Sequence, residues 1–223
     1  MSTKPILFNT EMVRANLDGR KSCTRRLVKT RRKDACGFYV TRKKTDGTFA
    51  GIYEYDENES VFDNPLEPLY QPGDILYVRE TVWQKTGHYL DVDGETKAVW
   101  CNEFKYVSTD EKPETGWNYS WAKRPSIHMP KEAARIWLKV TDVRVERLQE
   151  ITEAGAEAEG AVNNIGMIHA PDNEYDHIHT AKEHFIEIWN STIKKSDIDR
   201  YGWDANPYVW VIEFERCEKP EEN

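Results

Sequence analysis

The sequence predicts a mixed α+β protein built mostly of antiparallel strands. Three observations indicate this class: short apolar runs recur along the chain, turn residues separate them, and few stretches have the spacing and end signals of helices. No Pro-, Gly- or Ser-rich linker divides the 223 residues. We therefore expect one elaborated domain over residues 1–223, long enough to bury a sizeable core.

The first helix is marked by its ends. After a short apolar strand at residues 6–8, Asn9 or Thr10 can cap a helix over about 9–18, which Gly19 stops. This helix delivers the chain directly to a basic stretch.

Turn residues mark the strands that follow. Asp46-Gly47 and Asp93-Gly94 each predict a hairpin, because this dipeptide suits the tight turns that join antiparallel strands. Strands are expected at residues 37–44, 48–55, 75–78, 136–148 and 208–214, and the hairpin around Asp93-Gly94 at about 88–100.

Two later helices have N-terminal caps. Thr152 caps a short helix that carries Glu153 in its first turn and ends at Gly160. Thr180 and Glu183 form a capping box for an amphipathic helix at about 180–190. The side chains that this helix is expected to bury are Phe185, Ile188 and Trp189.

The stretch Gly19–Arg26, GRKSCTRR, concentrates the chemistry of the chain. Residues 20–33 hold eight Lys/Arg and no acid, which suits a phosphate-bearing ligand. The neighbouring arginines disfavour another cation, so we expect the pKa of Lys21 to fall. A neutral lysine can activate a hydroxyl as a nucleophile, and Thr24 supplies the hydroxyl.

A structural role for the same residues is the alternative. Short basic runs are usually solvated, and Arg20 and Lys21 suit the dipole at a helix C-terminus. In a regular strand, Lys21 and Thr24 also point to opposite faces. They can cooperate only if a turn or bulge follows Gly19.

Four segments together resemble the ASCH domain, a small β-barrel related to the PUA domains that bind RNA. In order, they are GRKSCTRR, YQPGDILYVRE, ITEAGAEAEG and VWVIEFER. The family motifs fall on Gly19, Lys21, Thr24, Arg26, Pro72-Gly73-Asp74, Thr152 and Glu153. The resemblance implies a PUA-like, mostly antiparallel barrel with flanking helices and two large insertions, at about 30–70 and 84–130. The segment Trp121–Pro130 resembles a longer, phage-associated subgroup.

One enzymatic branch is similar to amidohydrolases that remove the acetyl group from the exocyclic amine of acetylcytidine. For this chain the resemblance implies that Lys21 is the base, Thr24 the nucleophile and Glu153 the group that handles the proton of the departing amine. Arg26 and Arg79 would hold the base carbonyl, the ribose or a phosphate.

Further substrate contacts are expected around these residues. Arg79, Glu80 and Trp83 place a cation, an acid and an aromatic ring together at the end of one strand, and His128 lies between two prolines that fix the backbone. The segment 100–121 holds six aromatic residues, which can stack on a base or form a core for the insertion. The substrate-binding set is Gly19, Arg20, Arg26, Arg79, Glu80, Trp83 and His128.

Two other functions fit the same fold. One is a module that binds RNA or a modified base without chemistry, and the other is a ribonuclease. A free nucleoside and a short RNA are both suitable partners. The net charge of −8 divides into +9 over residues 1–50 and −17 over the remainder, which makes long duplex DNA an unsuitable partner.

No metal or other cofactor is expected. The four cysteines lack CxxC spacing, and Asp176, His177, His179 and His184 lack the spacing of zinc ligands. No apolar run reaches the roughly 18 residues that span a bilayer, and the N-terminus lacks the apolar core of a signal peptide. We therefore expect a cytoplasmic protein; the sequence contains no indication of its oligomeric state.

Overall fold

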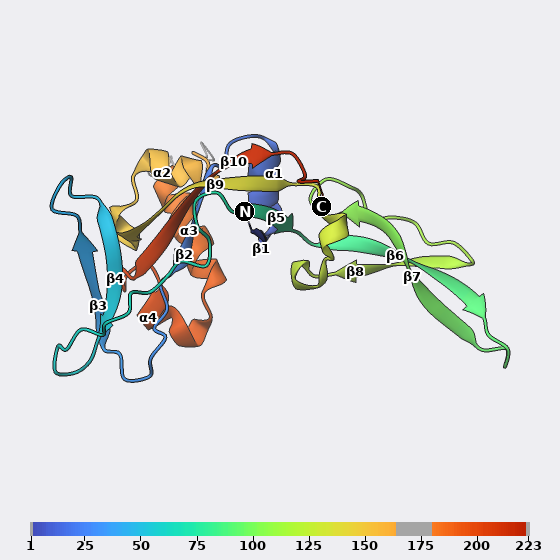
Figure 1. Cartoon of the computed structure of the whole chain (residues 1–223). Helices are drawn as coiled ribbons and strands as arrows, with labels where there is room; N and C mark the ends of the chain where they lie inside the picture. Colours follow the sequence, from blue (N-terminus) through green and yellow to red (C-terminus); the bar gives the residue numbers. More distant parts are fainter. Residues whose placement is uncertain (1, 164–179, 222–223) are drawn as a thin grey trace, which may run out of the picture. The chain divides into compact units, whose positions relative to one another are not determined.

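The computed structural model describes residues 2–163 and 180–221 (Figure 1). It confirms a mixed α+β protein whose strands pair mostly antiparallel. Its contacts divide the chain into two compact units. Unit 1 comprises Met1–Lys21, Gly73–Lys139 and Glu215–Asn223, and unit 2 comprises Ser22–Pro72 and Val140–Phe214.

Unit 1 contains a short mixed ladder of strands. β1 (Thr3–Leu7) runs parallel to β5 (Ile75–Arg79), and β5 pairs antiparallel with the first residues of β9 (Trp137–Arg147). Alternate residues of these strands face the core. Among them, Ile6 is 1% exposed and Leu76 is 0% exposed.

Helix α1 (Thr10–Leu17) begins and ends where its local signals predict. The side chain of Asn9 accepts a hydrogen bond from Met12 N at 2.8 Å, which satisfies one of the N–H groups left open at a helix start. Gly19 follows the helix with a φ of +75°, a left-handed conformation that glycine adopts without strain. The backbone N–H groups of Arg20 and Lys21 then both donate to Ala15 O, which fixes the turn.

We expect Asn9→Ala to lower the free energy of unfolding by about 1 kcal/mol, because Met12 N–H loses its partner. Urea denaturation measures the difference. Asn9→Asp is the matched control, since a carboxylate also caps a helix. An alanine variant as stable as the parent would contradict the capping role.

The second sheet of unit 1 has three antiparallel strands. They are β6 (Val82–Leu90), β7 (Thr96–Tyr106) and β8 (Tyr119–Arg124), in the order β7-β6-β8. The predicted Asp93-Gly94 turn joins β6 to β7, with Gly94 at a φ of +79°. Two 3-10 turns, η1 (Ser126–His128) and η2 (Lys131–Ala133), follow β8. Buried Val82, Met129 and Ala133 form a small core under this sheet.

The strands of unit 2 form a ladder and a separate hairpin. β2 (Cys23–Leu27) pairs antiparallel with β10 (Tyr208–Cys217), and the later part of β9 precedes β10 in the order β9-β10-β2. β3 (Gly37–Arg42) and β4 (Phe49–Tyr55) form the hairpin that Asp46-Gly47 predicts.

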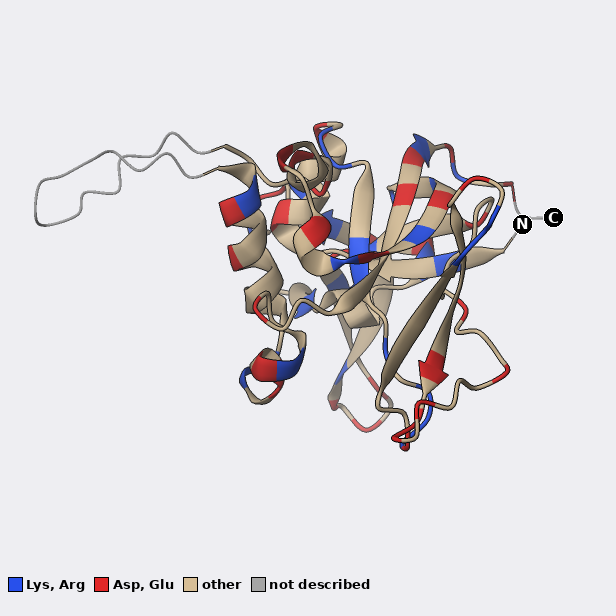
Figure 2. Cartoon of the chain, turned by 90° about the vertical axis from the view of Figure 1, so that its left-hand side faces the viewer, with Lys and Arg blue, Asp and Glu red and all other residues tan. Residues whose placement is uncertain are grey.

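Three helices complete unit 2: α2 (Glu153–Ala158), α3 (Ala181–Thr192) and α4 (Ile198–Tyr201), with 3-10 turns η3 (Leu148–Glu150) and η4 (Lys195–Asp197). Phe185 and Trp189 of α3 share a buried core with Val209 and Val211 of β10, as the amphipathic pattern predicts, whereas Ile188, also predicted to be buried, is only half-buried. In the view of Figure 2, acidic and basic residues are interspersed over the helices and strands. None of the described helices is long and apolar enough to cross a membrane.

The prediction of a closed barrel is wrong for the described residues, because their strands form open sheets. Both predicted insertions contribute to this difference. The insertion at about 30–70 supplies the separate β3–β4 hairpin, and the insertion at about 84–130 supplies most of the β6–β8 sheet. Each of these strands pairs only within its own small sheet, so neither insertion adds a strand to a common barrel.

Candidate functional site

The predicted catalytic stretch divides between the two units after Lys21. Lys21 lies in the turn that follows α1, before β2 begins, so the alternation of a regular strand does not set its direction. Its residue is 4% exposed, and its ammonium lies 5.2 Å from the centre of the Phe8 ring. Gly19 and Arg20 are exposed, and Arg20 pairs with Asp18 at 3.1 Å.

In unit 2, Thr24 and Arg26 lie on the same face of β2. Thr24 is 2% exposed, and its Oγ1 accepts a hydrogen bond from Arg26 Nη1 at 2.8 Å. Burial lowers the pKa of Arg26 from its usual value, against the charges of Glu159 and Tyr70, which raise it. Because an arginine keeps its proton in proteins, the buried hydroxyl of Thr24 contacts a permanent cation.

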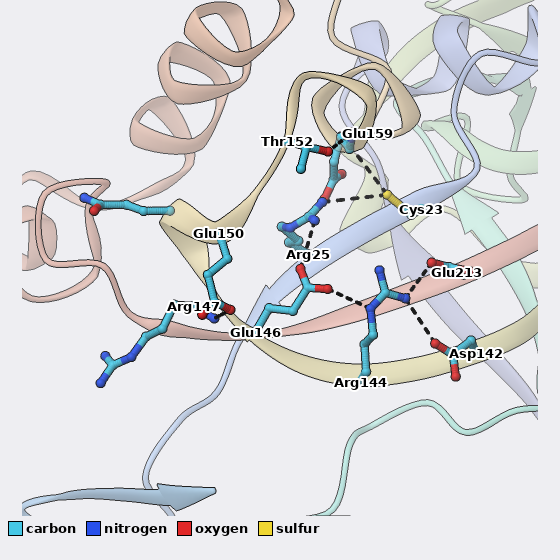
Figure 3. A network of polar contacts seen from close by, with 12 residues as sticks. Cys23, Arg25, Asp142, Arg144, Glu146, Arg147, Glu150, Thr152, Glu159 and Glu213 are labelled. Atoms are coloured by element: carbon cyan, nitrogen blue, oxygen red, sulfur yellow. Dashed lines mark hydrogen bonds and ion pairs between the residues drawn. The ribbon is translucent and has the colours of Figure 1, made fainter. Parts of the chain in front are cut away.

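A polar network surrounds Arg25 of the same strand, and no local sequence pattern marks it (Figure 3). Arg25 donates to Glu146 at 3.2 Å and to Glu159 at 3.4 Å, and the side chains of Arg25 and Glu159 are only 4% and 7% exposed. Cys23 Sγ lies 3.8 Å from Arg25 Nη1. Charges as buried as these require partners, so Arg25 and Glu159 hold each other in place.

Arg144 extends the network from β9. It donates to Glu146 at 2.7 Å, to Asp142 at 3.1 Å and to Glu213 (Figure 3). Burial alone lowers the pKa of Arg144, but its hydrogen bonds to Glu146 and Glu213 outweigh burial and raise the pKa. Arg25 and Arg144 therefore share the carboxylate of Glu146, which ties β2 to β9, and the bond from Arg144 to Glu213 adds β10.

Two of the three acids at α2, Glu153 and Glu159, have different surroundings. Glu153, the predicted catalytic acid, is exposed, and its Oε2 accepts a hydrogen bond from Lys182 N at 3.0 Å at the start of α3. Glu159, the C-terminal cap residue of α2, is 6% exposed, and its charge acts on both Arg25 and Arg26. Glu159 is thus the acid of α2 whose charge acts on Arg26, the partner of Thr24. No sequence signal distinguishes Glu159 from the neighbouring acids.

In unit 1, Arg79 contacts the backbone around His128. Arg79 Nε donates to Met129 O at 2.8 Å, and Nη2 donates to Ile127 O. These carbonyls flank His128, whose side chain is exposed. Arg79 therefore fixes the segment that presents His128.

Glu80 belongs to a buried ion pair. It is 2% exposed and accepts hydrogen bonds from Arg135 at 2.9 Å and 3.1 Å and from Ser108 Oγ. The guanidinium of Arg135 also lies 3.8 Å from the centre of the Tyr106 ring. Both oxygens of Glu80 are therefore engaged within unit 1.

The predicted site residues fall into two groups. Unit 1 holds Gly19, Arg20, Lys21, Arg79, Glu80, Trp83 and His128, and unit 2 holds Thr24, Arg26 and Glu153. Within unit 2, the structure brings Thr24 and Arg26 into contact. A cleft common to both groups stays a prediction.

No family model, curated protein or solved structure matches this chain. The resemblance to the ASCH domain stays a prediction that rests on the four segments quoted above.

The basic run after β2 is partly neutralised by the protein itself. The backbone N–H groups of Arg31 and Arg32 donate to Glu54 Oε1 at 2.6 Å and 3.1 Å, and Glu54 is 1% exposed. Arg32 also pairs with Asp34 at 3.1 Å and lies 4.0 Å from the centre of the Phe62 ring. A carboxylate thus occupies part of the region where cation density predicts a phosphate.

The histidine-rich segment at 176–184 is described only at its end. Asp176, His177 and His179 lie outside the described residues, and His184 Nδ1 accepts a hydrogen bond from Val162 N at 3.1 Å. Within residues 2–163 and 180–221, no three His, Cys, Asp or Glu side chains are grouped as metal ligands.

Proposed function

We propose that this protein hydrolyses the amide of an acylated cytosine nucleoside, with Thr24 as the nucleophile. The observation that carries the proposal is the hydrogen bond from Arg26 Nη1 to the buried Thr24 Oγ1, at 2.8 Å. A cation that donates to a hydroxyl oxygen stabilises its alkoxide form, and burial strengthens the interaction. The pair suits a threonine that must lose its proton to attack a carbonyl carbon.

Lys21 is the base in this proposal. It precedes Thr24 by three residues, and its role rests on the resemblance. Neutral Lys21 takes the proton of Thr24 Oγ1, the oxygen bonds to the acyl carbon, and the bond from that carbon to the exocyclic nitrogen breaks. A carboxylic acid protonates the departing amine.

Water then completes the reaction. The carboxylate left by the first step takes a proton from water, and the resulting hydroxide equivalent attacks the acyl-threonine ester. The ester bond breaks, Thr24 Oγ1 recovers its proton from the ammonium of Lys21, and the free acid leaves. Both groups return to their starting protonation states.

We assign the carboxylic acid to Glu159 in preference to Glu153. Glu159 is buried and its charge acts on Arg26, which itself contacts Thr24. Glu153 is exposed and uses one oxygen to hold Lys182 N.

The two candidate acids, Glu159 and Glu153, predict different effects of substitution on turnover. We expect Glu159→Gln to lower the turnover of acetylcytidine by about 100-fold or more, because glutamine cannot transfer the proton. Glu153→Gln should retain most of the turnover, as should Glu157→Gln, the control for an exposed acid of the same helix. Steady-state kinetics with a thermal melt of each variant separates catalysis from folding. The reverse order of effects would return the role to Glu153.

A module that binds RNA or a modified base without chemistry is the second candidate. Rings and lysines on the β6–β8 sheet favour it; Lys85 Nζ, for example, lies 4.9 Å from the centre of the Tyr119 ring. Incubation with acetylcytidine, followed by chromatography for cytidine, distinguishes the two. Release of cytidine that Lys21→Ala abolishes supports hydrolysis, and binding without release supports the second candidate.

A further inference from the structure

One face of the β6–β8 sheet carries aromatic rings and lysines together. We call it the lysine–tryptophan face, and it consists of Trp83, Lys85, Lys105, Tyr119, Trp121 and Lys123. Residues that pair across antiparallel strands share a face. Trp83 pairs with Lys105 on one side and Lys123 on the other, and Lys85 pairs with Trp121.

The ammonium groups of this face lie against its rings. Lys85 Nζ is 4.9 Å from the ring centre of Tyr119 and 5.8 Å from that of Trp121. Lys123 Nζ is 5.8 Å from the ring centre of Trp83, and Lys105 Nζ is 5.8 Å from that of Trp121. These separations are typical of cation–π contacts, so the side chains form one continuous surface.

The opposite face of the sheet packs against the protein. Val82 and Phe104 lie on that face and contact the core formed with Met129 and Ala133. The rings of the lysine–tryptophan face are therefore not needed for this core. They are half-buried, while Lys105 and Lys123 are exposed.

The exposed lysines of this face are available to bind a ligand. Among the described residues, Lys85 is in an ion pair, with Glu103 at 2.7 Å, whereas Lys105 and Lys123 have none. The Tyr119 ring is packed against the backbone of Gly116, where a Cβ would meet Tyr119 Cε1.

We propose that the lysine–tryptophan face binds single-stranded RNA. Bases stack on Trp83 and Trp121, and the lysines turn from the rings to the phosphates, as long flexible side chains allow. Duplexes are excluded as the preferred partner because their bases are already stacked with one another. The choice of RNA over DNA rests on the proposed function, since cytidine is a ribonucleoside.

The test measures binding without turnover. A short, fluorescein-labelled, mixed-sequence RNA is titrated with the whole protein, and fluorescence anisotropy gives the Kd at several salt concentrations. The same sequence as DNA and as duplex RNA provides the comparison ligands. A thermal melt of each variant confirms folding.

Trp121→Ala should weaken RNA binding about tenfold, because one stacking platform is removed. The matched control is Tyr39→Ala, which removes an exposed ring, 56% exposed, from β3 in unit 2. The control should keep the parent Kd. If Trp121→Ala folds and binds RNA as the parent does, the proposal is overturned.

A charge variant provides a second, independent readout. Lys105→Ala with Lys123→Ala should reduce the slope of log Kd against log salt concentration by about 0.7 for each phosphate that the variant no longer binds. Lys43→Ala with Lys44→Ala removes the same charge from the exposed β3–β4 turn and should leave the slope unchanged. Equal slopes for the two double variants, or tighter binding of duplex than of single strands, would overturn the proposal. Binding of DNA alone would overturn the choice of RNA.

The result is separable from that of the proposed hydrolysis. Hydrolysis is measured on free acetylcytidine and RNA binding is measured without turnover. An inactive protein that binds single-stranded RNA through this face would refute only the proposed function. An active protein that does not bind RNA would refute only this inference.

Discussion

Lys21→Arg is expected to lower the turnover of acetylcytidine by at least about 100-fold while nucleoside binding persists. A guanidinium keeps the positive charge but cannot accept a proton at the pH of the assay, so the base is lost. The parent enzyme should also gain activity as pH rises, because Lys21 must lose its proton before it can activate Thr24. Steady-state kinetics over a pH series, with nucleoside binding by calorimetry, measures both effects.

Lys29→Arg is the control for the same chemical change at an exposed position of the basic run. It should leave turnover and its pH profile unchanged. A Lys21→Arg protein with full turnover would end the proposed mechanism. The stretch Gly19–Arg26 would then be better described as an anion-binding edge of a recognition domain.

Arg135→Ala is expected to lower the free energy of unfolding by about 3–5 kcal/mol. Glu80 is 2% exposed, and the substitution removes the guanidinium that donates to both of its oxygens. The buried carboxylate would then have neither water nor a cation to stabilise its charge. Chemical denaturation measures the difference in stability.

Lys139→Gln is the matched control in unit 1. Its ion pair with Glu215 is 3.8 Å long, and the side chains are 43% and 61% exposed, so its removal should lower stability by less than about 1 kcal/mol. Glu80→Gln with Arg135→Met should recover most of the stability that Arg135→Ala loses, because no buried charge is left unpaired. A small effect of Arg135→Ala would show that Glu80 has access to water.

Helices and hairpins whose cap or turn signal lies within a few consecutive residues could be predicted from the sequence. Asn9 caps α1, Asp46-Gly47 turns the β3–β4 hairpin, and Thr180 with Glu183 forms the capping box of α3. Each signal acts through a hydrogen bond or a backbone angle of the same segment. The α+β class follows from the order of such segments, whereas the closure of strands into a barrel depends on pairing between distant ones.

The contacts of the candidate site depend on that distant pairing. Arg25 and Glu159 are 134 residues apart, and Glu80 and Arg135 are 55 apart, so no local pattern predicts either pair. The aromatic residues of the segment 100–121 form a recognisable group in the sequence. Their division between two faces of a sheet depends on the register of β6 against β7 and β8, which no short segment determines alone.

Glu54 places a buried carboxylate beside the basic run at residues 20–33. Because its carboxylate is held by the backbone N–H groups of Arg31 and Arg32, the protein brings its own counterion into the fold. That counterion cannot diffuse away, unlike the salt ions around an exposed lysine tract. Part of the positive charge of residues 20–33 is thus compensated inside the folded protein, so a nucleic acid would displace fewer salt ions from this run than its eight cations suggest.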